Sequence, residues 1–274
     1  MVHPPFAYRN LGDEMKQKKE NKKYFIISVI SLAVFILFWE LLTDILHLLP
    51  EKKLPSPATI VETFIYKLTN TNPDGSVLGI HILTSLQESV LGFCIGIILG
   101  VPIGICMAWF EKFDMFFKPL FDLIKPIPPV GWVPVMLMAF GLGIMSKVTV
   151  IVIAAIVPAI INSYSGIKQM NPVHKWVAQT FGASNGQILK TIAIPTAGPM
   201  IFAGIRVSLN ASWVTLVAAE LVASTKGLGY MIQMGRMVGR IDLVFMGVLV
   251  IGGFGALFSW LLGMAERRIV KGGR

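Results

Sequence analysis

The chain has 274 residues, of which 54% are hydrophobic and only 14% are charged, and its mean hydropathy is +0.70. These values exclude an ordinary soluble globular protein. The composition predicts an all-α integral membrane protein. The net charge of +9 must therefore be judged by where the basic residues lie, and it does not by itself indicate a nucleic-acid partner.

Six stretches are predicted to span the bilayer, since a spanning helix needs about 20 mostly apolar residues. In chain order they cover residues 24–42, 81–110, 120–141, 147–164, 199–222 and 243–265. The third is interrupted by Pro126, Pro128, Pro129 and Pro134. We expect a basic tail at 1–23, a six-helix transmembrane domain at 24–265 and a second basic tail at 266–274. The first span follows a long polar stretch and is expected to be retained rather than cleaved.

The segment between the first two spans, residues 54–64, reads as an extended stretch followed by a short helix. Ser56 is a candidate helix cap, Pro57 suits the first helical position, and Ile60, Val61 and Phe64 would share a face. A plain connecting loop is the alternative interpretation of the same residues.

Four glycines recur every fourth residue in the second span, at Gly92, Gly96, Gly100 and Gly104. Small residues at this spacing allow helix backbones to approach closely in lipid. The pattern predicts a packing face, and the neighbouring helix could belong to the same chain or to a second copy. Cys94 and Cys106, about 18 Å apart along the same helix, are too far apart to pair.

The basic residues favour one orientation of the six spans. With both tails in the cytoplasm, 16 of the 24 Lys and Arg residues fall in the tails and in the loops at 109–125 and 165–198, against 7 on the other side. The positive-inside rule therefore predicts cytoplasmic termini. It also accounts for the net charge, because these residues face anionic lipid.

Ionisable residues inside spans are costly and suggest function. Glu88 lies in the second span and could line a path or brace helices. In the fifth span a stripe recurs at steps of three and four residues: Arg206, Asn210, Trp213, Val217 and Glu220. Such a stripe is expected to face the bundle interior. Glu88, Arg206, Asn210, Trp213 and Glu220 are therefore the candidate translocation path, with hydrogen bonding between helices as the alternative.

The loop at 165–198 is polar but carries an apolar edge at helical spacing, formed by Val177, Phe181, Ile188 and Ile192. An amphipathic segment of this kind lies on a membrane or in the groove of a partner. Gly182 can adopt a positive φ and allow one short helix to end and another to begin. The chain has no G-x-x-x-x-G-K-[ST] motif, so it lacks the loop that would hold ATP phosphates.

The spacing in this loop resembles the cytoplasmic loop of ABC-importer permeases, where Glu-Ala-Ala is followed by Gly and then by Ile-x-Leu-Pro. Four residues fit the register: Ala178, Gly182, Ile192 and Pro195. Trp176 and Val177 stand where the family has Glu and Ala, and Ile194 replaces Leu. The resemblance implies that an ATPase-coupling loop is formed by Trp176, Val177, Ala178, Phe181, Gly182, Ile192 and Pro195.

Further motifs between residues 50 and 270 are similar to the nitrate, sulfonate, taurine and bicarbonate branch of these permeases. They are Leu54-Pro55-Ser56-Pro57, Gly204-Ile205-Arg206-Val207 through to Ala219-Glu220, Gly227-Leu228-Gly229-Tyr230, Arg240 to Val244, and Glu266-Arg267-Arg268. The resemblance implies a type I ABC-importer permease fold in the cell (inner) membrane.

The same resemblance implies the partners. A second permease copy would complete the path, two cytoplasmic ATPase subunits would bind ATP and magnesium, and an extracytoplasmic binding protein would deliver a small solute, with an oxyanion or sulfonate expected. The chain itself is expected to bind no cofactor.

The sequence leaves two other functions to consider. An ion-coupled secondary transporter needs intramembrane ion-coupling groups, for which Glu88 and Glu220 are candidates, but the chain shows no clear internal repeat. An intramembrane enzyme or metal site needs a group of catalytic or metal-binding residues, and the sequence shows none. The histidines are scattered over tails and loops, at His3, His47, His81 and His174.

Overall fold

The computed structural model describes residues 11–46 and 53–269 and divides into two units, residues 1–62 and 63–274. In the first unit, α1 (Leu11–Glu40) continues into a π-helical turn (Leu41–Ile45), and residues 26–44 are long and apolar enough to span a membrane. Helix α1 thus begins well before the predicted span, and residues 1–10 of the predicted tail lie outside the described part. Helix α2 (Pro57–Thr69) begins in this unit and ends in the next.

The N-terminus of α2 follows the predicted pattern. The backbone N–H of Thr59 donates to the Ser56 hydroxyl oxygen at 3.2 Å, and Pro57 takes the first helical position, where no backbone donor is needed. The short helix is therefore confirmed over the plain loop.

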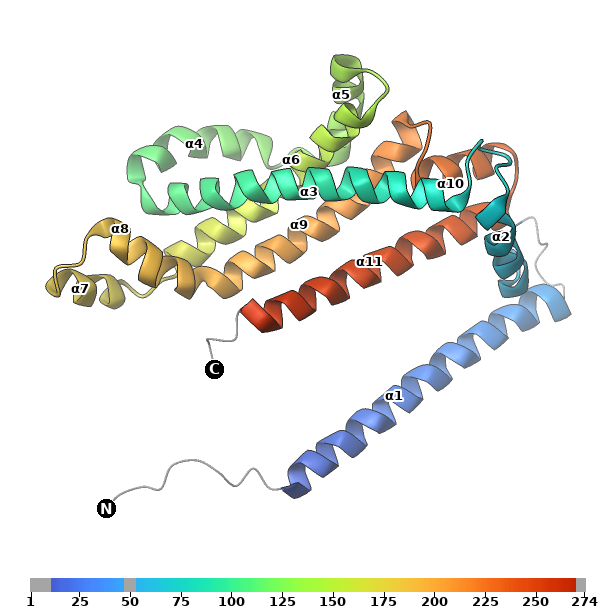
Figure 1. Ribbon diagram of the computed structural model, residues 1–274, viewed down its shortest axis with the longest axis horizontal. Helices are drawn as coiled ribbons and strands as arrows, with labels where there is room; N and C mark the ends of the chain where they lie inside the picture. The colour runs from blue at the N-terminus through green and yellow to red at the C-terminus, as the bar shows by residue number, and fades with distance from the viewer. Residues whose placement is uncertain (1–10, 47–52, 270–274) are drawn as a thin grey trace. The chain divides into compact units, whose positions relative to one another are not determined.

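The second unit is helical throughout its described elements (Figure 1). They are α3 (Leu78–Trp109), α4 (Glu111–Ile124), the 3-10 turn Pro129–Trp132, α5 (Val133–Phe140), α6 (Ile144–Lys168), α7 (Pro172–Thr180), α8 (Asn185–Ile188), the π-helical turn Leu189–Ala193, α9 (Ile194–Ala223), α10 (Leu228–Met237) and α11 (Ile241–Ile269).

The described residues contain five helices that could each cross a membrane, and a sixth span if α4 and the segment 129–140 count as one. Those two pieces meet at an angle of 85°. The break coincides with Pro126, Pro128 and Pro129, because proline removes a helix donor and disfavours helical geometry in the residue before it. The third predicted span, at 120–141, is thus a bent one.

Helix α6 lies between α3 and α9 and forms the centre of the bundle. The glycines of α3 face α6: a Cβ added at Gly100 would lie 2.8 Å from the Cβ of Ala159, and one at Gly104 would lie 2.6 Å from the carbonyl oxygen of Ile160. No side chain fits at such separations. The predicted glycine packing face is confirmed, and its neighbour is a helix of the same chain, to which α3 runs parallel.

Helix α9 runs antiparallel to α6 and is joined to it by a buried hydrogen bond from the Ser208 hydroxyl to the Ala155 carbonyl oxygen, 2.7 Å. Helix α11 returns antiparallel to α9, and the Trp213 indole N–H donates to the Ile251 carbonyl oxygen at 3.1 Å. The end of this bundle that carries α7 and α8 is termed the loop end. The opposite end, where α3 begins and α9 finishes, is termed the far end.

Candidate functional site

The segment from α7 to α8 forms a compact helical hairpin at the loop end. The Asn171 side chain caps α7 by accepting from the Val173 N–H at 3.0 Å. Ser184 and Gln187 form a reciprocal capping box at the start of α8. Between them Gly182 has φ +78°, so the predicted positive φ at this turn is confirmed.

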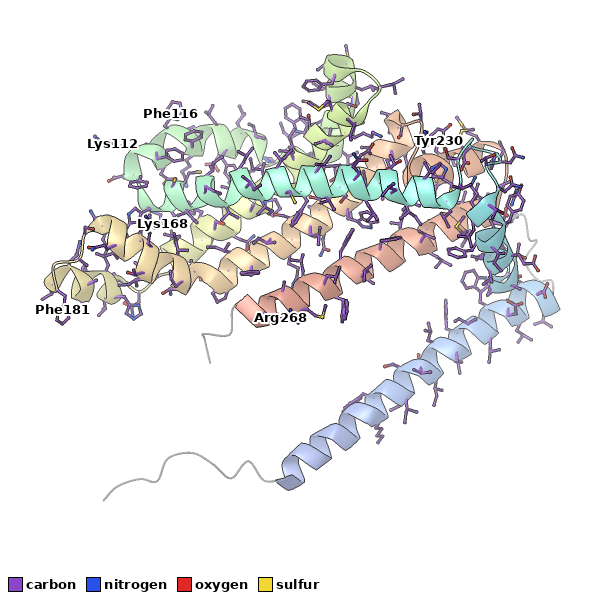
Figure 2. All side chains as sticks on the ribbon, in the orientation of Figure 1. Lys112, Phe116, Lys168, Phe181, Tyr230 and Arg268 are labelled. Atoms are coloured by element: carbon purple, nitrogen blue, oxygen red, sulfur yellow. The ribbon has the colours of Figure 1, made fainter. Side chains whose placement is uncertain are left out.

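One part of this hairpin presents apolar side chains to its surroundings. Trp176 is 61% exposed, Val177 50% and Phe181 87%. Figure 2 shows Phe181 at the tip of the segment, directed away from the bundle. The predicted apolar edge does not continue past Gly182, because Ile188 is fully buried in the bundle. The exposed patch therefore belongs to α7 and does not extend to α8, and a buried apolar cluster at the same end of the bundle anchors the segment.

The anchor is an apolar cluster shared by α3, α6, α9 and the turn that precedes α9. Its buried members are Ala108, Ile167, Ala193, Ala197 and Ile201. Lys175 of α7 adds a cation–π contact, since its Nζ lies 5.3 Å from the centre of the Trp109 ring at the end of α3. Helix α7 is thus held at the bundle end while its apolar side chains stay exposed.

At the far end, three successive backbone donors are each bound by a different side chain. The N–H of Gly227 donates to His81 Nδ1 at 3.0 Å, that of Leu228 to Ser85 Oγ at 2.9 Å, and that of Gly229 to Glu220 Oε2 at 2.7 Å. The Ser85 hydroxyl in turn donates to Glu220 Oε1 at 2.6 Å. Both oxygens of the buried Glu220 carboxylate are therefore engaged within the chain.

This network explains the Gly-Leu-Gly motif. Gly227 has φ +118°, and an added Cβ there would overlap the Glu220 carboxylate. A Cβ at Gly229 would lie 2.7 Å from the Glu220 Cβ. Both positions need glycine because the backbone passes directly over a buried side chain.

A second buried group adjoins the network. The Lys67 ammonium donates to Asp74 Oδ1 at 2.5 Å and to the carbonyl oxygens of Asn72 and Ser76 at 3.0 and 2.8 Å. His81 Nε2 lies 3.3 Å from Asp74 Oδ2. Burial raises the pKa of the Asp74 carboxyl, but hydrogen bonds from His81 and Lys67 outweigh this and hold that pKa below its ordinary value.

Glu88 lies two turns along α3 from His81 and pairs with Lys147 near the start of α6. The pair is almost fully buried, with side-chain exposures of 3% and 7%. Lys147 also donates to the Ser224 hydroxyl oxygen at 2.9 Å, which links the pair to the loop after α9. The structure thus gives Glu88 a bracing contact.

The other candidate path residues lie in different surroundings. Arg206 pairs with Glu266 of α11, and the two side chains are 47% and 32% exposed. Asn210 is exposed, whereas Trp213 is buried against Phe258 with ring centres 5.1 Å apart. The stripe is therefore exposed in its first half and buried in its second. Its role as a path stays a prediction.

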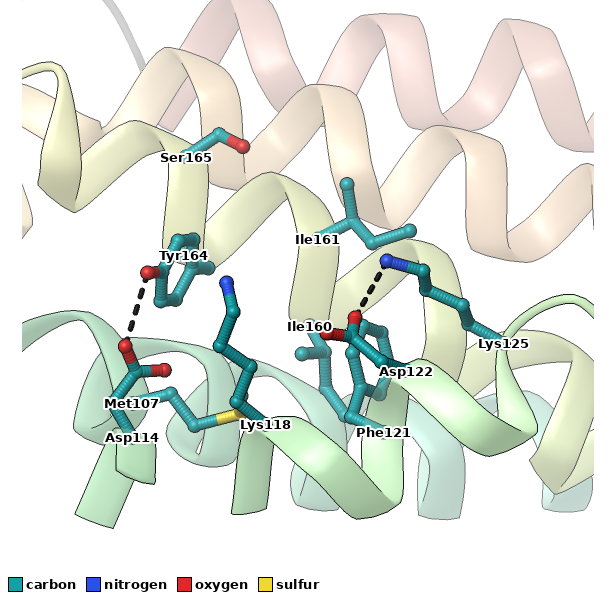
Figure 3. A pocket seen from close by; sticks show the side chains of 10 residues that line it. All are labelled: Met107, Asp114, Lys118, Phe121, Asp122, Lys125, Ile160, Ile161, Tyr164 and Ser165. Atoms are coloured by element: carbon teal, nitrogen blue, oxygen red, sulfur yellow. Dashed lines mark hydrogen bonds and ion pairs between the residues drawn. The ribbon is translucent and has the colours of Figure 1, made fainter. Parts of the chain in front are cut away.

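A pocket of about 160 Å³ lies near the loop end between α4 and α6. In Figure 3 the Tyr164 hydroxyl points towards Asp114, to which it donates at 3.2 Å, and Lys125 points towards Asp122, 2.6 Å away. Lys118 lies 5.8 Å from the centre of the Tyr164 ring. The charges that line the pocket are balanced, so it shows no preference for an anion.

Sequence reasoning missed three residues of the far-end network. Lys147 marks only the start of the predicted span at 147–164, and the predicted site does not include Ser85. His81 was grouped with histidines of tails and loops, which is wrong, because it is fully buried in α3. The available signal was that His81, Ser85 and Glu88 continue the glycine face of α3 at steps of three and four. His3 and His47 lie outside the described residues.

Comparison with known proteins gives a consistent result. Residues 92–271 match the family of binding-protein-dependent transport system inner membrane components. The chain is 33% identical over 248 residues to the taurine transport system permease protein TauC of Escherichia coli K12, covering 89% of this chain and 87% of that protein. It is 29% identical to the putative aliphatic sulfonates transport permease protein SsuC of Bacillus subtilis, covering 95% and 92%.

A nitrate import permease protein, NrtB of Synechococcus elongatus, is 29% identical and covers 78% of each chain. Among solved structures, an inward-facing MetNI methionine ABC transporter aligns with a TM-score of 0.58 at 16% identity, covering 77% of this chain and 97% of that one. An amino acid ABC transporter aligns with a TM-score of 0.59 at 17% identity, covering 69% and 92%.

The likeness to these structures confirms the expected all-α, type I ABC-importer permease fold. The relatives are transport components rather than enzymes, and they favour this class over an ion-coupled secondary transporter. The chain belongs to the family of binding-protein-dependent transport system inner membrane components, as the permease subunit of an ABC importer.

Proposed function

We propose that this permease carries a small sulfonate or oxyanion, delivered by an extracytoplasmic binding protein and driven by two cytoplasmic ATPase subunits. The observation that carries the ATPase part is the exposed apolar patch on α7, set on a buried anchor at the loop end. Similarity to taurine, sulfonate and nitrate permeases supports the solute class.

The docking chemistry proposed for α7 is burial of apolar area in a groove of the ATPase. In place of the motif carboxylate, which would pair with a basic group or a helix N-terminus, this chain has Trp176, whose ring has a large apolar surface and an indole N–H donor. Phe181 would extend the same contact, since it is the most exposed of the three apolar side chains.

Trp176→Ala in the reconstituted permease–ATPase complex tests this contact. The variant is expected to keep most of its basal ATP hydrolysis but to lose at least about tenfold in solute uptake per ATP, since a buried Trp at an interface contributes about 2 kcal/mol or more. Trp260→Ala is the matched control, because Trp260 is 60% exposed on α11. Unchanged uptake per ATP in Trp176→Ala would overturn the docking proposal.

The proposed orientation places both tails and the loop end in the cytoplasm, supported by the excess of Lys and Arg in the tails and the loops at 109–125 and 165–198. Single cysteines at Lys190 and Lys226, in a chain whose Cys94 and Cys106 are replaced, provide a test in intact cells. A membrane-impermeant thiol reagent is expected to label the cysteine at 226 only. Labelling of position 190 alone would reverse the orientation.

The translocation path is proposed to lie between this chain and a second copy, lined in part by the candidate residues Glu88, Arg206, Asn210, Trp213 and Glu220. Arg206 and Asn210 are exposed, whereas Glu88, Trp213 and Glu220 are buried. Substitutions can therefore test the exposed residues apart from the buried ones. Arg206→Ala and Asn210→Ala are expected to reduce uptake while changing stability by no more than about 0.5 kcal/mol. Wild-type uptake in both would remove the exposed half of the stripe from the path.

A further inference from the structure

Helix α4 is amphipathic in the reverse sense to a helix of a water-soluble protein. Its opposite side presents apolar side chains to the surroundings, because Phe116, Leu120 and Leu123 are each at least 50% exposed. A charged stripe runs along the other side at steps of four and three residues, and Figure 3 shows it on the side that faces α6: Asp114, Lys118, Asp122 and Lys125. The helix thus turns its charges towards the bundle and its apolar surface outwards.

The pocket between α4 and α6 lies within the length of a spanning helix. It is lined by Ile160 and Tyr164, and α6 ends at Lys168. At 1.5 Å per residue, Ile160 lies about 12 Å of helix inside that end. The ion pair of Lys125 with Asp122 lines the same pocket, and the two side chains are 44% and 43% exposed. Exposed charges at this depth are costly in hydrocarbon, so the pair requires contact with water.

Both sides of α4 fit a helix that separates lipid from water. Together with the segment 129–140, α4 is long and apolar enough to cross a membrane. The backbone is broken between these two pieces, and irregular backbone at membrane depth is tolerated only inside protein or beside a water-filled cavity. The pocket volume of about 160 Å³ is roughly tenfold the space that one water molecule needs. It can therefore hold several waters.

We propose that this pocket is a water-filled vestibule of the transport path at the loop end, enclosed by α4 and α6 of one chain. Its two Lys and two Asp side chains hold water without binding an anion tightly, and weak binding is what a solute needs in order to leave. The inference rests on the proposed function, because the vestibule serves the transported solute. It adds to the path a part that lies within a single chain.

Single cysteines on the two sides of α4 test the vestibule, in the full-length chain with Cys94 and Cys106 replaced and reconstituted with its ATPase. A charged, membrane-impermeant thiol reagent is supplied on both sides of the membrane, so the result does not depend on orientation. Lys118→Cys is expected to react at least about tenfold faster than its control Leu120→Cys, because the reactive thiolate forms in water and not in hydrocarbon. Equal rates, or a faster reaction at position 120, would overturn the proposal.

Ser165→Cys keeps the test decisive even where Lys118→Cys fails to fold. Ser165 lines the pocket from α6, and cysteine differs from serine by one atom. This variant is also expected to react at least about tenfold faster than Leu120→Cys. A rate no higher than that of Leu120→Cys would contradict a water-filled pocket.

Uptake measured before and after labelling separates the vestibule from the proposed function. Labelled Ser165→Cys is expected to lose most of its uptake of taurine or nitrate, because the attached group fills the pocket, whereas Leu120→Cys keeps its uptake. Full uptake by labelled Ser165→Cys would remove the pocket from the path and leave the importer function in place. A wild-type complex that takes up none of these solutes would reject the proposed solute class, and the labelling rates, which need no transport, would still decide whether the pocket holds water.

Discussion

The buried face of α3 is built in two different ways along its length. Near the far end it carries His81, Ser85 and Glu88, each bonded to another part of the chain. From Gly92 to Gly104 it carries only glycine at every fourth residue and approaches α6 closely. One half fixes loops through directional bonds, and the other fixes the separation of two helices through van der Waals contact.

One helix face of α3 thus serves two purposes. In lipid, apolar side chains are already in an apolar medium, so the hydrophobic effect does not drive helices together. Close packing of the two backbones must therefore stabilise the pair. Hydrogen bonds act on particular atoms, so the polar half positions the turn at 227–229. Substitutions in the two halves should therefore fail in different ways.

The largest effect is expected in the glycine half. Gly96→Val places side-chain atoms where the Cβ of Ala155 already lies, and it should cost about 3 kcal/mol or prevent folding. Gly79→Ala is the control on the same helix, because an added Cβ there meets nothing within 4 Å. Thermal unfolding of the purified proteins measures both. Equal stability of the two variants would contradict close packing of α3 on α6.

A smaller loss is expected in the polar half. Ser85→Ala removes the donor to Glu220 and the acceptor of the Leu228 N–H, and it should destabilise the fold by about 2 kcal/mol. Ser89→Ala, one turn later, is a matched control because the equally buried Ser89 hydroxyl has no partner among the described residues. Hydrogen exchange at Leu228 should rise only in Ser85→Ala. Equal exchange in both variants would argue against the bond.

Acid should weaken the far end selectively. The folded-state pKa of Asp74 lies below its ordinary value, so its contribution to stability is present above about pH 3.9 and is lost as pH falls through the folded-state pKa. The stability difference between wild type and Asp74→Asn should therefore shrink from pH 6 towards pH 3. Thermal unfolding across this pH range measures the difference. A stability difference between wild type and Asp74→Asn that stays constant over this pH range would contradict the pairing of Asp74 with Lys67 and His81.

The smallest effect is expected for the ion pair between Arg206 and Glu266. Both side chains are partly exposed, so Arg206→Gln should change stability by only about 0.5 kcal/mol. Thermal unfolding at low and high salt measures it. A loss as large as that of Ser85→Ala would show that this pair braces α9 against α11 as strongly as the far-end network braces its turn.

Much of the fold could be predicted because spans and turns depend on local chemistry. Apolar runs located the spanning helices, Pro126 to Pro129 marked the bend, and Gly182 marked the turn in the loop. The spacing of Gly92 to Gly104 predicted a packing face. The helix that packs against that face is determined by the tertiary arrangement, which no local sequence pattern specifies.

The far-end network could not be predicted for the same reason. His81 and Gly227 are 146 residues apart, and Ser85 and Glu220 are 135 apart. Glu88 was recognised as costly in a span, but its partner Lys147 lies at a span boundary, where lysine is common. The polar stripe of α9 was read from helical periodicity alone, and the neighbours that bury only its second half belong to α3, α10 and α11.

The three bonds to the 227–229 turn have a mechanical consequence. Because consecutive N–H groups are held by side chains from both α3 and α9, α10 cannot tilt without breaking several bonds at once, and these three helices must move as one rigid body. Any change of shape during transport would then need a hinge elsewhere. The proline-rich 85° bend between α4 and the segment 129–140 is one joint in the described bundle where helical hydrogen bonding is already interrupted.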